Sequence, residues 1–136
     1  MEPETSPAAQ AIRAMRAVEQ RQREAWLAGF AADALLEDPV GHAPPRRGAD
    51  AIADFWDTGI AALENVRFDV RRAHEGPREA LMLVDVTARA PGGASASYDA
   101  ALHYVFDEQG AIVALRAFWD LPDVVAQFTG AAAAAE

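Results

Sequence analysis

The chain has 136 residues, of which 51% are hydrophobic, enough for one continuous core. The formal net charge of −9 disfavours nucleic acids and anionic membrane surfaces as partners, because both are bound by clustered Lys and Arg. The absence of cysteine excludes disulfides, thiolate chemistry and cysteine-based metal sites. Acid–base catalysis or plain binding remains. We expect one domain over residues 1–136, with short flexible ends at about 1–6 and 130–136.

The sequence lacks the features of a membrane or secreted protein. No run approaches the roughly 18 apolar residues that a membrane span needs. The segment 1–7 has neither the basic nor the apolar region of a signal peptide. We therefore predict a cytoplasmic protein without a membrane segment.

The first half of the chain has helical patterns. Ser6 followed by Pro7 is typical of an N-cap and first turn, and predicts a helix over about 7–20. Apolar residues at helical spacing predict a second, short helix over 23–30 and a third over 49–63.

The segments between and after these helices follow other patterns. A residue before proline avoids helical geometry, so 35–37 should be a short extended piece that ends at Asp38. Prolines and a glycine make 42–48 a loop. From Val66 the apolar period becomes two, which indicates strands. We predict strands over 66–70, 80–88, 95–106 and 111–119, a helical turn over 121–128, and an alanine-rich tail without pattern over 130–136.

Helices first and antiparallel strands second predict an α+β fold, in which a curved, mainly antiparallel sheet wraps over the helices as a cone. One face of that sheet alternates large and small apolar residues and can line an apolar pocket for a small apolar ligand. The three histidines lack ligand spacing, and no phosphate-binding or nucleophile motif occurs. We predict no metal and no cofactor.

Several segments resemble the ketosteroid isomerases: residues 37–41 (EDPVG), 55–56 (FW), 103–106 (HYVF) and 116–119 (RAFW). Nearly the whole chain from Arg13 to Phe128 can be laid on that pattern. The resemblance implies the nuclear-transport-factor-2-like (cystatin-like) cone, a fold shared with SnoaL-like polyketide cyclases and small epoxide hydrolases. It also implies a steroid delta-isomerase activity.

By this resemblance Asp38 is the base that moves a proton between two carbons of a steroid enone. A carboxylate at the edge of an apolar pocket should have a raised pKa, which improves it as a base while it stays ionised at neutral pH. The alternative is that Asp38 merely caps a turn.

The chain departs from the family at the donors that hold the enolate oxygen, a tyrosine and a protonated aspartic acid. These positions fall on Ala14 and Leu102. Tyr98 lies an even number of residues from Leu102, should share its face, and is our substitute donor; an ordinary cavity-lining aromatic is the alternative. Asp99 should point to the opposite face and is not assigned.

We expect eight further residues to contact the ligand: Met15, Val40, Phe55, Trp56, Met82, Val84, Leu102 and Trp119. For the two tryptophans, Trp56 and Trp119, packing in the core is the alternative.

The opposite face of the sheet should carry Leu81, Leu83, His103 and Val105. This patch is too apolar for a monomer, so we predict a homodimer. His103 is then structural or interfacial. His42 follows the Asp38 turn, and we expect a surface loop residue there, with a place at the pocket mouth as the alternative.

Two other functions stay open. One is non-catalytic binding of a steroid or a similar flat apolar molecule, favoured by the loss of both family donors. The other is a polyether-type epoxide hydrolase or cyclase, in which Glu64 would be the acid partner of Asp38, unless Glu64 is a solvated surface residue.

Overall fold

The structure is a computed structural model that describes the backbone of residues 6–134 and the side chains of residues 6–130. Its first helix, α1 (Pro7–Glu19), begins as predicted, with the Ser6 hydroxyl accepting the amide of Ala9 at 3.1 Å. Met15 and Val18 are buried on one face of α1 and pack into the core.

The second helix is shorter than predicted and the strand after it is longer. α2 (Arg23–Ala28) ends before Gly29, and Phe30 begins β1 (Phe30–Glu37). The predicted helix end and the short extended piece are therefore corrected. The reason is non-local: the carbonyl of Gly29 accepts the amide of Ile112 at 2.8 Å, and pairing with a distant strand overrides local helix propensity.

The third helix changes type before it ends. α3 (Ala49–Phe55) continues as the π-helical turn η2 (Trp56–Ile60), where the amide of Ala61 donates to the carbonyl of Trp56 at 2.8 Å. The hydroxyl of Thr58 donates to a backbone carbonyl one turn earlier, a contact that bends helices. The uniform helix predicted over 49–63 is corrected accordingly.

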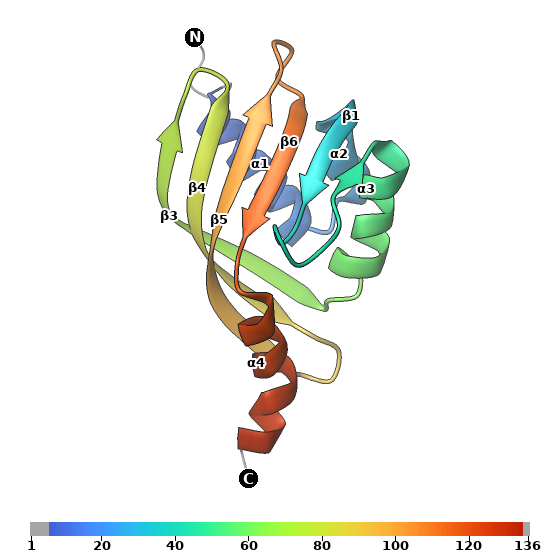
Figure 1. Cartoon of the computed structure of the whole chain (residues 1–136), viewed down its shortest axis with the longest axis vertical. Helices are drawn as coiled ribbons and strands as arrows, with labels where there is room; N and C mark the ends of the chain where they lie inside the picture. The colour runs from blue at the N-terminus through green and yellow to red at the C-terminus, as the bar shows by residue number, and fades with distance from the viewer. Residues whose placement is uncertain (1–5, 135–136) are drawn as a thin grey trace.

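The sheet has six strands in the order β2-β1-β6-β5-β4-β3 (Figure 1). β4 (Glu79–Arg89), β5 (Ser95–Phe106) and β6 (Ile112–Phe118) agree with the predicted strands to within one residue. β3 (Asn65–Glu75) extends past its predicted end, and β2 (Arg46–Arg47) lies in the predicted loop. β1 and β6 pair in parallel and every other pair is antiparallel.

The helices lie on the concave side of this sheet. α1 packs across β3 and β4, while α3 packs beside β1 and β2 (Figure 1). The predicted α+β cone of the nuclear-transport-factor-2-like kind, with a curved and mainly antiparallel sheet, is confirmed.

The last helix, α4 (Leu121–Ala134), is about twice as long as the predicted turn and extends beyond the end of the sheet (Figure 1). Asp120 caps it, since its carboxylate accepts the amide of Asp123 at 3.0 Å. The helix continues through the alanine-rich segment because alanine has the highest helix propensity. Of the predicted flexible ends, residues 1–5 and 135–136 lie outside the described residues.

Candidate active site

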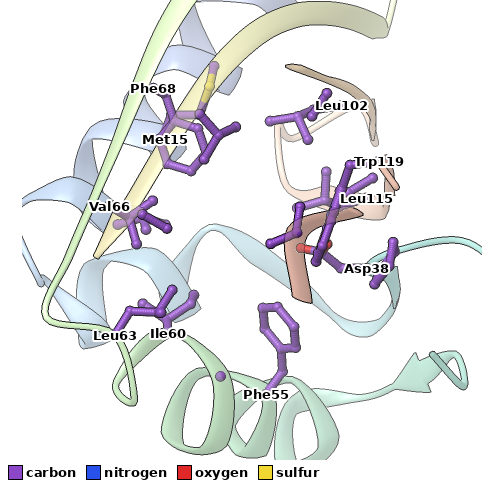
Figure 2. Close-up of a pocket in the computed structure, with 18 of the residues that line it drawn as sticks. Met15, Asp38, Phe55, Ile60, Leu63, Val66, Phe68, Leu102, Leu115 and Trp119 are labelled. Carbon is purple, nitrogen blue, oxygen red and sulfur yellow. The ribbon is translucent and has the colours of Figure 1, made fainter. Parts of the chain in front are cut away.

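A cavity of about 380 Å³ lies between the helices and the concave face of the sheet. This volume is within the range of small-molecule sites. Figure 2 shows Asp38 and Trp119 on one wall, with Met15 and Phe68 across the cavity and Phe55 at its floor. The lining is mostly apolar; the lining side chains that carry a nitrogen or oxygen are Trp26, Asp38, Tyr98, Tyr104 and Trp119.

Asp38 is placed by the end of β1. Glu37 lies beside Arg116 in the parallel β1–β6 pair, and the two side chains form an ion pair of 2.7 Å. Successive strand residues face opposite sides, so Asp38 turns toward the cavity. The amide of Val40 donates to the carbonyl of Ala117 at 2.8 Å and fixes the turn that follows.

The surroundings of Asp38 make it a stronger base than an ordinary carboxylate. The side chain is half-buried, and loss of water raises its pKa to about 6. The indole N–H of Trp119 donates to Oδ1 at 2.6 Å and partly opposes that rise, because it stabilises the charged form. No cation pairs with Asp38 among the described residues, and Oδ2 has no donor there.

Such a carboxylate remains mostly ionised at neutral pH and can take a proton from a weak acid. Trp119 orients the group without neutralising it. The site can therefore perform proton transfer on an apolar molecule.

Tyr98 lies on the inner face of β5, as the alternation of that strand predicts. Its ring packs on Trp119 with 5.1 Å between centroids, while Asp99 beside it is exposed. The β4–β5 register runs unbroken from Ser95 to Val105, so no bulge in this pair changes the face on which Tyr98 lies. Burial and the charge of Asp38 both raise the pKa of Tyr98, which keeps its phenol protonated and able to donate.

The structure brings together one part of the predicted ligand-contacting set. Met15, Phe55, Leu102 and Trp119 line the cavity, together with Asp38 and Tyr98.

Four predicted contacts lie elsewhere and are corrected. Met82 and Val84 are completely buried in the part of β4 that α1 covers, so the inward-facing residues there fill the core. Trp56 packs against Trp26, with 5.3 Å between ring centroids. Val40 lies in the turn after Asp38, outside the cavity lining, and its backbone amide donates to the carbonyl of Ala117.

Sequence reasoning missed several lining residues. Tyr104 is two residues from Leu102, so the parity argument that selected Tyr98 also applies to it. Leu121, Val124 and Phe128 come from α4; the sequence predicted a helical turn here but gave no signal that it faces the cavity.

The remaining sequence candidates lie outside the cavity. His42 and Glu64 are exposed, and neither belongs to the lining. His103 lies on the outer face of β5, where Nε2 is 2.8 Å from a carboxylate oxygen of Glu79. Ala14 packs against the core without lining the cavity.

Residues 6–134 contain no cluster of three or more histidines or acids that could hold a metal ion. None of the helices in this part of the chain has the length and hydrophobicity of a membrane span.

Residues 11–115 match the profile of the SnoaL-like domain. The chain belongs to the SnoaL-like family. This family lies within the nuclear-transport-factor-2-like superfamily, as the resemblance implied. No curated protein matches the chain.

Solved structures of this SnoaL-like fold include proteins that bind or transform steroids. A Delta 5-3-ketosteroid isomerase from Mycobacterium sp. is 30% identical, with a TM-score of 0.79, over 87% of this chain and 96% of that chain. RV0760c from Mycobacterium tuberculosis, in complex with estradiol-17beta-hemisuccinate, is 26% identical with the same TM-score, over 87% of this chain and 97% of that chain.

A third structure shares the fold at lower identity. The epoxide hydrolase/cyclase-like enzyme SalBIII, described in pyran ring formation in polyether salinomycin, is 20% identical with a TM-score of 0.78. The match covers 90% of this chain and 97% of that chain.

Proposed function

We propose that this SnoaL-like protein is a steroid delta-isomerase-like enzyme. It would transfer a proton within a 3-ketosteroid or a similar apolar enone, without a cofactor. The observation that carries the proposal is the carboxylate of Asp38, which faces an apolar cavity, has no cationic partner among the described residues, and is oriented by Trp119.

The proposed reaction uses Asp38 twice. Its carboxylate removes a proton from the carbon between the carbonyl and the isolated double bond, and the electron pair forms a dienolate. The resulting carboxylic acid then returns that proton to the far carbon of the dienolate, which leaves a conjugated enone. A carboxylate whose pKa is raised to about 6 suits this task. The higher pKa makes it a stronger base toward the weakly acidic C–H group, and it stays mostly ionised at neutral pH.

The dienolate oxygen needs a hydrogen-bond donor, since loss of such a donor typically slows an enzyme by about 10²–10³-fold. We assign this role to Tyr98. Its ring packs on Trp119, whose indole holds Asp38, so base and donor share one wall of the cavity. The raised pKa of Tyr98 favours the protonated donor.

The structural neighbours support the ligand class. One is named a ketosteroid isomerase and another is in complex with a steroid derivative. A small, flat, apolar molecule is therefore the ligand we propose here.

The first test is a spectrophotometric assay of a 5-ene-3-ketosteroid as it becomes a conjugated enone, with wild type and Asp38→Asn in parallel. We expect turnover by the wild type and its loss in the variant, with steroid binding retained. Steroid binding without turnover by either protein would contradict the isomerase proposal.

That last outcome would support the second candidate, a non-catalytic steroid binder. The observation that favours this candidate is the absence of a side-chain donor at Ala14 and Leu102. The epoxide hydrolase or cyclase alternative needs a second carboxylate in the pocket. Asp38 is the one acidic residue of the described lining, and Glu64 is exposed outside it.

We further infer a homodimer formed through the outer face of the sheet. Two large apolar side chains there remain exposed to water, Leu81 at 36% and Phe118 at 42%. Exposed apolar patches of this kind mark association surfaces. The cytoplasmic location stays a prediction from the sequence.

A further inference from the structure

The cavity contains a second phenol that the proposed reaction does not use. Tyr104 lies on the inner face of β5 and lines the cavity, yet its side chain is only 3% exposed. Its ring stacks on Phe106, with 6.1 Å between centroids. Its hydroxyl makes no hydrogen bond within the described part of the chain.

This unpaired hydroxyl is not sealed in the core. Among the described residues, no side-chain nitrogen or oxygen is completely buried without a partner. The Tyr104 hydroxyl must therefore retain some accessible surface, and the cavity is the space that Tyr104 lines. A protonated phenol without a partner in an apolar cavity can donate a hydrogen bond to an oxygen of the ligand.

The strand register places Tyr104 relative to Asp38. Tyr104 pairs with Leu115, and Leu115 pairs with Leu36 of β1, so these three residues form one row across the sheet. Asp38 is two residues beyond Leu36, which is about 7 Å along the strand. The two strand spacings between them add about 10 Å across the sheet.

Tyr98 lies on the other side of the Asp38 row. It lies six positions before Tyr104 on the same face of β5, about 20 Å along an extended strand. The Asp38 carboxylate thus lies between two inward-facing phenols. Its negative charge contributes to the raised pKa of both tyrosines, consistent with one shared cavity.

We propose that Tyr104 binds the ligand by donating a hydrogen bond to an oxygen at the end of the molecule away from Tyr98. The ligand class follows: an elongated apolar molecule with an acceptor oxygen, such as a ketone, at each end. This inference rests on the proposed function and deepens it, because it concerns which steroid-like molecules the same cavity selects.

The experiment measures dissociation constants for three ligands: a steroid with ketones at both ends, and its two analogues that each lack one ketone. Each is titrated against wild type, Tyr104→Phe and the matched control Tyr98→Phe. Phenylalanine retains the ring and removes a hydroxyl that has no partner in the described structure, so the unfolding midpoint should be unchanged.

We expect Tyr104→Phe to bind the diketone about tenfold more weakly than wild type does. It should bind one of the mono-ketones as tightly as wild type does, and Tyr98→Phe should show the loss with the opposite analogue. Equal weakening of all three ligands by Tyr104→Phe, or no weakening of any, would overturn the role of Tyr104.

The two proposals can fail separately. Oxygen-dependent binding through Tyr104 without turnover would refute the isomerase and retain this inference. Turnover that depends on Asp38, with binding indifferent to the Tyr104 hydroxyl, would do the reverse. If the wild type binds none of the three steroids, both proposals fail.

Discussion

The two faces of the sheet use neighbouring residues for opposite purposes. On the outer face Glu37 forms an ion pair with Arg116 and is structural. On the inner face Asp38, the next residue, meets apolar walls and an indole N–H. Two carboxylates one residue apart thus differ in role because strand alternation gives one a cation and the other none.

β5 repeats this lesson. Tyr98 faces the cavity, whereas Asp99 is exposed on the outside. On β5 the charged side chain lies on the face that water solvates, so the cavity keeps a low dielectric around Asp38, the one acid of its described lining. The function of a residue in this fold follows from its face more than from its chemical type.

Replacing the inner carboxylate and the outer carboxylate separately should give the largest difference in turnover. Asp38→Asn should lower turnover of the 5-ene-3-ketosteroid by about 10²–10⁴-fold, the usual contribution of a general base. Glu37→Gln should leave turnover within about twofold, because that carboxylate lies outside the cavity. Steady-state rates of both variants test this; equal losses would mean that Asp38 acts through the fold alone.

The pH profile should carry the signature of the inner carboxylate. The rate should fall along a single limb below a pH of about 6, as Asp38 becomes protonated. A bell-shaped profile would instead indicate a second essential group.

The same raised pKa affects stability. Asp38 holds its proton more tightly in the folded than in the unfolded chain, so its contribution to stability is complete below pH 4 or so and is lost as pH rises through about 6. At pH 7, Asp38→Asn should raise the free energy of unfolding by roughly 1–3 kcal/mol, and near pH 3.5 by almost nothing. Urea unfolding at both pH values measures the difference; an equal gain at both would contradict the linkage.

Trp119→Phe should have a smaller effect than loss of the Asp38 carboxylate, because it changes the basicity of Asp38 and leaves the carboxylate in place. The ring that packs on Tyr98 is retained, but the N–H that stabilises the ionised form of Asp38 is lost. The pKa of Asp38 should therefore rise, and the acid limb of the rate profile should move to higher pH. An unmoved limb would mean that this bond does not set the basicity.

Changes confined to the outer face should affect assembly and leave the chemistry nearly intact. We expect Leu81→Glu combined with Phe118→Glu to convert a dimer into a monomer, because the exposed apolar side chains become charged. Light scattering at micromolar concentration gives the mass, and turnover per chain should stay within about twofold. A monomeric wild type would refute the dimer.

Local patterns predicted much of this molecule. The cap at Ser6, the strand alternation of β5 and the turn at Asp38 are all recorded in neighbouring residues, and the inward position of Tyr98 followed from counting by two. The family resemblance then supplied the cone and the importance of Asp38.

Several of the missed features depend on contacts between distant residues. The bond between Trp119 and Asp38 joins positions 81 residues apart, and it requires the parallel register of β1 and β6. The same pairing draws Phe30 out of the predicted helix. Met82 and Val84 have the right parity for the cavity, but the position of α1, which no period in the sequence specifies, buries them in the core.

The attachment of α4 bears on how fast ligands enter and leave. The side-chain amide of Gln127 accepts the amide of Ser97 at 2.8 Å and donates to its carbonyl at 3.0 Å, which holds the helix beside the cavity. Both bonds join uncharged groups, so dissolved ions do not screen them. For a neutral ligand, association and dissociation rates should therefore be nearly independent of ionic strength, despite the net charge of −9 on the protein.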